Sequence, residues 1–206
     1  MRVFRPVLAV AAFALTAGSA VAQEQGRFAT VEVRAGFTQT SKGTSSDLAA
    51  KQSLKGQSSF GAGAAIALGT RIHLGLTADW AHHSVYQPAG DTVIGGANDQ
   101  QWNVLHTFVK VSYSLIQMPK LTVALNAGPG LMIFSPNQVV RDSTGERSDA
   151  HFAVNGGATI TWWFSDRIGL MASPQADYAF KKSSGQIFKF KSAKMFPITG
   201  GFQFKI

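Results

Sequence analysis

Most of the chain beyond residue 27 alternates between apolar and polar residues with a period of two, which is typical of β-strands with one apolar face. In segment 28–40, for example, Val31 and Val33 share one face, and Glu32 and Arg34 share the other. The sequence predicts eight such strands, at 28–40, 58–68, 72–83, 102–115, 121–134, 151–164, 168–180 and 196–206.

Two of these segments depart from strict alternation. In the fourth, Trp102, Val104 and Phe108 fall on the polar parity. The fifth contains Pro129, and proline inside a strand is typical of an edge or a bulge.

The connections between the segments alternate in length. Three are short, at 69–71, 116–120 and 165–167, and four are long, at 41–57, 84–101, 135–150 and 181–195. An even number of strands with tight turns at one end and long loops at the other is typical of outer-membrane barrels, whose turns are periplasmic and whose loops are extracellular. The pattern predicts an all-β fold, an eight-stranded antiparallel up-and-down transmembrane β-barrel.

This topology also predicts where the aromatic side chains lie, because such rings favour the two membrane interfaces. The residues expected at the outer rim are Phe37, Phe60, Trp80, Phe134, Phe152, Phe180 and Phe196. Those expected at the inner rim are Phe28, Tyr113, Trp162, Trp163, Phe164, Phe204 and Ile206.

The first 22 residues have the pattern of a cleaved secretory signal peptide. Arg2 and Arg5 precede an apolar run, and Ala20-Val21-Ala22 supplies an A-x-A cleavage site. Cleavage near Ala22 leaves residues 23–206 as the barrel domain. It removes two of the 19 basic residues, so 17 remain against 11 acidic ones and the formal charge falls from +8 to +6. An exported chain of this kind is not expected to bind nucleic acid.

The absence of cysteine excludes disulfides, cysteine-ligated metal sites and thiol catalysis. No phosphate-binding loop, dinucleotide fingerprint or calcium-binding loop is present either. We expect no cofactor and no metal.

The C-terminal residues Thr199, Gly201, Phe204 and Ile206 match the spacing polar-x-Gly-x-x-hydrophobic-x-hydrophobic. They resemble the signal that the bacterial barrel-assembly machinery reads, with Ile in place of the commoner terminal Phe. With the signal peptide and the eight strands, the chain resembles the small eight-stranded outer-membrane barrels, a class that includes the OmpA transmembrane domain, OmpX and the porin-family barrel domains. The resemblance implies insertion in a Gram-negative outer membrane by that machinery.

Several charged residues fall on the polar face that would line the barrel. An interior of eight strands is just wide enough for side chains to fill, so charges there must pair or bind water. We expect an interior polar plug of ion pairs, with a gated path for ions or protons as the alternative. Its members are Glu32, Arg34, Asp79, His106, Lys110, Asp177 and Lys205.

A second group of polar residues gathers near the end of the third segment: Asp79, His82, His83, Ser84 and Asp91. These types could supply a nucleophile, a base and an orienting acid. Lipid A deacylases use Ser, His and an acidic residue on such a barrel, but the His-x-Ser strand motif of that family has no counterpart here. We interpret the group as a polar rim without catalysis.

The last long loop carries lysines interleaved with Phe188 and Phe190, and it has no acidic residue. On an outer surface these ammonium groups favour contact with lipopolysaccharide phosphates, and a solvated hairpin is the alternative. The lysines are Lys181, Lys182, Lys189, Lys191 and Lys194.

Together these features predict a monomeric, non-catalytic outer-membrane barrel with a structural or surface-interaction role: envelope integrity, or contact with lipopolysaccharide or an extracellular partner. Two alternatives remain open. One is an outer-membrane enzyme that modifies lipid A. The other is a soluble periplasmic barrel that binds an apolar ligand, in which the apolar face would point inward.

Overall fold

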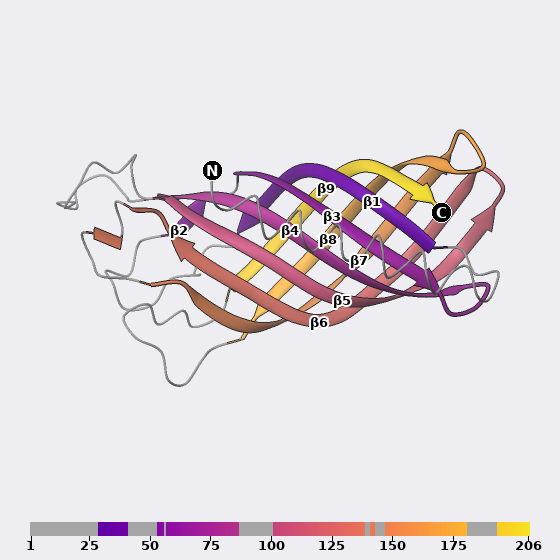
Figure 1. Cartoon of the computed structure of the whole chain (residues 1–206). Coiled ribbons are helices and arrows are strands. Elements are labelled where there is room, and N and C mark those ends of the chain that lie inside the picture. Colours follow the sequence, from indigo (N-terminus) through magenta and orange to yellow (C-terminus); the bar gives the residue numbers. More distant parts are fainter. Residues whose placement is uncertain are drawn as a thin grey trace.

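The computed structural model describes residues 29–40, 53–55, 57–86, 101–138, 141–142, 147–180 and 193–206. Long, tilted, antiparallel strands wrap around a common axis (Figure 1). The strands are β1 (Ala29–Thr40), β2 (Ser53–Lys55), β3 (Gln57–Ala67), β4 (Ile72–Tyr86), β5 (Gln101–Met118), β6 (Leu121–Pro136), β7 (Asp149–Trp163), β8 (Ile168–Ala179) and β9 (Ala193–Lys205).

Eight of these strands form a closed barrel. From β3 onward each strand pairs with its neighbours in sequence, and β1 pairs with both β3 and β9. The amide of Ile206 donates a 2.8 Å hydrogen bond to the carbonyl of Ala29 at the closing seam. The short β2 adds to the far end of β4, beyond the barrel wall. The prediction of an eight-stranded antiparallel up-and-down barrel is confirmed.

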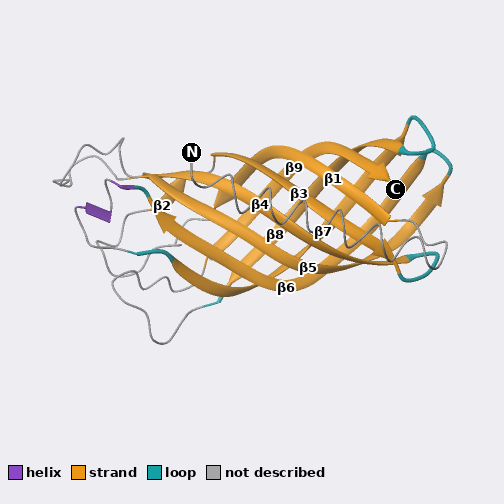
Figure 2. Ribbon diagram, viewed as in Figure 1, coloured by secondary structure: helices purple, strands orange, loops and turns teal. Residues whose placement is uncertain are grey.

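The three tight turns lie at one end of the barrel, which we call the turn side (Figure 2). The turn between β7 and β8 is held by Ser165, whose hydroxyl accepts hydrogen bonds from the amides of Arg167 and Ile168. The turn between β3 and β4 is closed by the amide of Leu68, which donates to the carbonyl of Ile72. The opposite end is the loop side.

Alternation along the strands separates two environments, because successive side chains of a strand point to opposite faces. Val33 faces outward and is 48% exposed, whereas its neighbour Arg34 faces the interior and is 6% exposed. The outer surface is apolar on every side: exposed residues include Leu76, Val109, Val111, Leu125, Leu131, Ile160, Leu170, Ile198 and Phe202.

The bulge of the barrel is not at Pro129. The register of β5 with β6 shifts between Ser114 and Ile116, so Leu115 and Ile116 both face outward. Pro129 keeps its pairing with Val154 of β7, and the register on the β5 side is the same before and after it. Proline is tolerated there because only the ladder toward β5 is interrupted, so the strand predicted at 121–134 is confirmed.

Most of the expected rim aromatics face outward. Phe37, Phe152, Phe180 and Phe196 are exposed near the loop side, and Tyr113, Trp162, Phe164 and Phe204 are exposed near the turn side. Two are corrections: Phe134 and Trp163 are 1% and 5% exposed and point into the barrel. Their strand parity, rather than their depth, decides the face. Phe28 lies outside the described residues.

Across the described ranges, no helix is both long enough and apolar enough to cross a bilayer.

Candidate functional site

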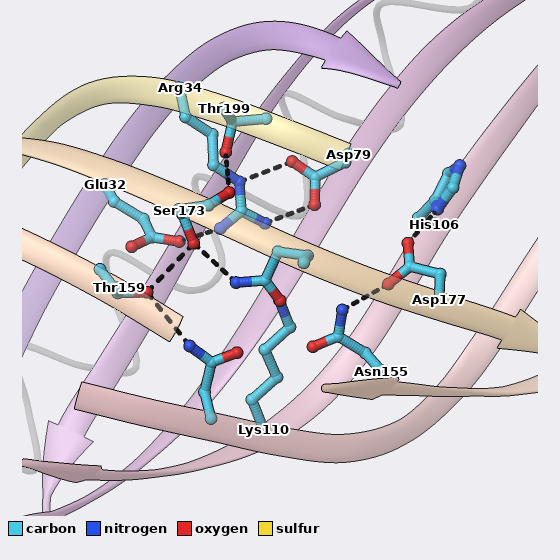
Figure 3. Close-up of polar contacts among 12 residues, drawn as sticks. Glu32, Arg34, Asp79, His106, Lys110, Asn155, Thr159, Ser173, Asp177 and Thr199 are labelled. Atoms are coloured by element: carbon cyan, nitrogen blue, oxygen red, sulfur yellow. Dashed lines mark hydrogen bonds and ion pairs between the residues drawn. The ribbon is translucent and has the colours of Figure 1, made fainter. Parts of the chain in front are cut away.

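The centre of the barrel is occupied by an arginine held between two carboxylates (Figure 3). Arg34 of β1 donates from Nε to Asp79 Oδ1 at 2.6 Å, and its Nη2 binds Asp79 Oδ2. Its Nη1 binds Glu32 Oε1 at 2.5 Å. The Arg34 side chain is 3% exposed, so this is a buried guanidinium whose three nitrogens each contact a carboxylate oxygen. We call these three residues the Arg34 cluster.

Two glycines of β3 make room for the Arg34 cluster. The strand β3 lies between β1 and β4, so Asp79 must cross it to reach Arg34. A Cβ atom on Gly61 would lie 2.1 Å from Asp79 Oδ1, and one on Gly63 would lie 2.7 Å from Glu32 Oε1. The Gly-Ala-Gly segment therefore serves close packing of side chains over the strand.

A second buried group joins β5, β7 and β8. Nδ1 of His106 lies 2.6 Å from Asp177 Oδ2, and Asn155 Nδ2 donates to the other oxygen, Oδ1. His106 is 1% exposed and Asp177 is 4% exposed. The carboxylate is thus held by partners from two other strands, which fixes the spacing of the barrel walls at this depth.

Lys110 begins a polar chain that crosses the barrel (Figure 3). Its Nζ donates to Gln175 Oε1 at 3.0 Å, and Gln175 Nε2 donates to Ser173 Oγ at 2.6 Å. Ser173 Oγ lies 3.1 Å from Thr159 Oγ1, which accepts from Asn126 Nδ2. Within the described part of the chain, no carboxylate forms an ion pair with Lys110.

The last interior cation, Lys205, lies on an aromatic ring near the turn side. Its Nζ is 3.9 Å from the centroid of the Trp163 ring, a cation–π contact. The indole N–H of Trp163 donates to Thr122 Oγ1 at 3.0 Å. These two contacts give both the indole N–H and the ring of the inward-facing Trp163 a partner in the interior.

Apolar side chains pack together in the loop-side half of the interior, beside buried polar residues such as Thr38, Ser59 and His83. This loop-side cluster consists of Trp102, Val104, Phe108, Met132, Phe134, Ala153, Ala179, Ala193 and Met195. Every member is at most 2% exposed, so the packing leaves no open path along this part of the axis. Trp102, Val104 and Phe108, the residues that broke the alternation of their segment, belong to this cluster.

The turn-side half is hollow. It contains a cavity of about 1030 Å³ that extends from Lys110 and the Arg34 cluster to turn residues such as Arg167. Inward positions of β3, β4 and β6 there carry small residues, among them Ala65, Gly75 and Ala124. Small side chains on these three strands account for the space. The expectation of an interior filled throughout was therefore wrong for this half.

The seven residues expected in the interior all line it, but they form separate groups. Glu32, Arg34 and Asp79 join one another, His106 joins Asp177, and Lys110 and Lys205 contact uncharged groups. Sequence reasoning missed Gln175 and Asn155. Both share the inward parity of Asp177, so parity was the signal that could have identified them.

Of the residues considered for catalysis, the three with described side chains, Asp79, His82 and His83, do not converge. Asp79 is bound to Arg34. His82 is partly exposed and its Nδ1 lies 2.9 Å from Asn103 Oδ1, whereas its neighbour His83 is fully buried on the inward parity. The side chain of Ser84 and all of Asp91 lie outside the description. Across the described ranges, no three His, Asp or Glu side chains form a group that could hold a metal ion.

Of the five loop lysines, only Lys194 is among the described residues. The other four lie outside them: Lys181, Lys182, Lys189 and Lys191. Lys194 is exposed, and its Nζ lies 6.0 Å from the centroid of the Tyr178 ring.

The four residues of the C-terminal pattern lie at the seam of β9. Thr199 is buried and donates to the carbonyl of Ser173 at 3.4 Å. Gly201 contacts β1 so closely that a Cβ atom would lie 2.0 Å from the carbonyl oxygen of Val33. Phe204 and Ile206 face outward.

Comparison with known proteins gives a match in fold. No family model matches this chain. No curated protein sequence matches it significantly. Three solved structures are similar across most of their length. The Neisserial surface protein A, NspA, is 11% identical with a TM-score of 0.54, and the match covers 88% of this chain and 98% of that one.

The other two structures are similar to this chain to about the same degree as NspA. The outer membrane protein OprG from Pseudomonas aeruginosa is 13% identical with a TM-score of 0.55, and the match covers 86% of this chain and 95% of OprG. A major outer membrane protein from Thermus thermophilus is 15% identical with a TM-score of 0.58, and the match covers 88% of this chain and 100% of that protein. This chain therefore has the fold of the small eight-stranded outer-membrane β-barrels.

Proposed function

We propose that this chain is an integral outer-membrane barrel with a structural or surface-interaction role. The observation that carries the proposal is the distribution of residues over the closed wall. Apolar side chains such as Val111 and Ile160 are 52% and 44% exposed on the outside, while Arg34, Asp79 and Lys110 are buried inside. A closed barrel satisfies its backbone hydrogen bonds, so such a wall can lie in hydrocarbon.

The same distribution argues against the soluble ligand-binding alternative. A soluble barrel needs a polar outer surface and an apolar interior. Here the outer surface is apolar and the middle of the interior is charged. The cavity in the turn-side half is lined in part by the charged residues Glu32, Arg34 and Lys110, which do not suit an apolar ligand.

Location and assembly follow from the ends of the chain. The pattern of residues 1–22 supports export, with cleavage near Ala22. The exposed Phe204 and Ile206 at the end of β9 support recognition by the barrel-assembly machinery. We place the turn side in the periplasm and the loop side outside the cell, and we propose that the barrel acts as a monomer.

The surface role rests on cations at the loop side. The exposed Lys194 has its Nζ 6.0 Å from the centroid of the Tyr178 ring. Tyr178 packs edge-on against Phe180, which stacks on Phe152 with their centroids 5.6 Å apart. Rings at the depth of the headgroups, with an ammonium beside them, suit the phosphates of lipopolysaccharide. The other four loop lysines would add to this attraction.

We propose that the barrel has no catalytic activity, because the described candidates Asp79, His82 and His83 do not converge. Alanine variants of His82, His83 and Ser84 test this point against the lipid A-modifying alternative. Mass analysis of lipid A should show the same species with the variants as with the wild-type chain. A lipid A species that depends on any of the three residues would contradict the proposal.

Electrophoresis of outer-membrane extracts tests the main proposal. A closed barrel resists detergent, so boiled and unboiled samples should migrate differently, and the chain should stay in the membrane fraction after washing with high salt. Release into the soluble fraction would contradict an integral membrane protein.

A further inference from the structure

The turn-side cavity is closed at one end and open at the other. The loop-side cluster seals it toward the loops, and exposed turn residues, among them Asp166 and Arg167, line its other end. Its volume of about 1030 Å³ matches that of small-molecule sites in proteins. In the orientation proposed above, this cavity opens to the periplasm.

The cations of the cavity are not all neutralised by the protein. All three side-chain nitrogens of Arg34 are bound by Asp79 and Glu32. By contrast, Lys110 Nζ has three donors and one described acceptor, the uncharged Gln175. Nearer the mouth, Lys205 and Arg167 form no ion pair with any described carboxylate. Lys110, Lys205 and Arg167 therefore lie along the cavity, from its inner end to its mouth, as cations without a direct ion-pair partner among the described carboxylates.

The cavity wall is rich in hydroxyl and amide side chains. Among the residues that line it are Thr122, Thr161 and Gln203. Such groups donate and accept hydrogen bonds, so a ligand that carries hydroxyl groups would suit this wall.

We propose that the turn-side cavity binds a small hydroxylated organic carboxylate. The carboxylate is held by Lys110 at the inner end of the cavity, and Lys205 and Arg167 attract it at the mouth. The hydroxyl groups of the ligand meet the polar wall. The binding is reversible and enters from the turn side, because the loop-side cluster closes the other route.

D-Gluconate and D-glucitol form a matched pair of probes, since they share a chain of hydroxyl groups and differ in the carboxylate. With the detergent-extracted barrel, we expect calorimetry to give a Kd for gluconate of about 1 mM or tighter and at least about tenfold weaker binding of glucitol. Equal affinity for both probes, or no heat of binding with gluconate, would overturn the proposal.

The variant Lys110→Met tests the anchor, and Lys194→Met on the outer surface is its control. Removing a buried charge that lacks an ionic partner should leave the barrel folded, which the heat-dependent mobility verifies. We expect Lys110→Met to weaken gluconate binding by at least about tenfold, Lys110→Arg to retain part of it, and Lys194→Met to leave it unchanged. Binding by Lys110→Met at the wild-type affinity would refute the assignment.

A second readout does not depend on the folding of any Lys110 variant. Trp163 lines the cavity, whereas its neighbour Trp162 is 55% exposed on the outside. On titration with gluconate, the indole N–H signal of Trp163 should move in the NMR spectrum and that of Trp162 should not. Equal movement of both signals would show binding to the outer surface. Because these measurements use the extracted protein, their failure would leave the proposed membrane location untouched.

Discussion

Asp79 reaches Arg34 from 45 positions away by lying across Gly61 of the intervening strand. A Cβ atom on Gly61 would occupy the place of the carboxylate oxygen, so Gly61→Ala should displace Asp79 and destabilise the barrel by about 1–3 kcal/mol, as overpacking typically does. Gly156→Ala is the matched control, because a Cβ atom on Gly156 would meet nothing within 4 Å. Urea unfolding in lipid vesicles measures both, and equal midpoints would contradict the role of Gly61.

The two carboxylates around Arg34 should differ in their contribution to stability. Asp79 provides two contacts to the guanidinium and Glu32 provides one. Asp79→Ala leaves a buried cation with much less compensation, and we expect a loss of about 3–5 kcal/mol. Glu32→Ala should cost clearly less, because Arg34 keeps Asp79. Urea unfolding of the two variants measures both losses of stability. A larger loss for Glu32→Ala than for Asp79→Ala would show that Glu32 is the more important partner of Arg34.

The two faces of the wall should respond differently to substitution. Arginine at the outward positions Val33, Leu76, Val111 or Ile160 would place a charge in hydrocarbon and should cost about 2–4 kcal/mol near the midplane. The inward-facing, 7% exposed Thr77 should tolerate Thr77→Ser with little change. The free energy of unfolding of each variant is measured in vesicles of known thickness. If the arginine variants were as stable as the wild type and Thr77→Ser were destabilised, the outward and inward faces would be the reverse of those described.

The loop-side cluster should block conduction. Wild-type protein in planar bilayers should show no stable, large conductance, because Phe108 and Met132 fill the axis. The double variant Phe108→Ala with Met132→Ala should raise the conductance, and the outward Val109→Ala is the control. A large conductance of the wild-type barrel would show that the cluster moves aside.

Cysteine labelling tests the orientation, and no native cysteine interferes. Asp166→Cys in the exposed turn should not react in intact cells with a maleimide too large to cross the outer membrane. Single cysteines at Ser45, Ala97, Thr144 and Ser184, which lie outside the described residues, should react. Labelling of residue 166 with protection of the other four would mean that the turn side faces outward.

The sequence predicts the wall of the barrel much better than its interior. The face of each residue depends on local parity, which is why Val33 and Arg34 could be assigned to opposite sides. Contacts across the interior depend on the register of every strand pair between the two residues. Lys110 meets Gln175 only after the registers of β5, β6, β7 and β8 are combined.

The cavity was missed for a related reason. Small inward residues such as Ala65, Gly75 and Ala124 are unremarkable within their own segments, and they create space only because closure brings them to the same depth. The apolar residues Trp102 and Phe108 did carry a signal, since they broke the alternation of their segment. The signal could be interpreted only with the knowledge that the interior is apolar at the loop side, where both residues belong to the loop-side cluster.

The seam between β1 and β9 sets the order in which this wall can be completed. The two strands hold the largest separation in sequence of any paired strands in the barrel, and Ile206 itself bonds Ala29. Until β9 arrives, the sheet keeps two free edges whose N–H and C=O groups can pair with any other strand. Closure is therefore a late event with a high entropic cost, and a nascent chain must be kept from its neighbours for as long as those edges stay open.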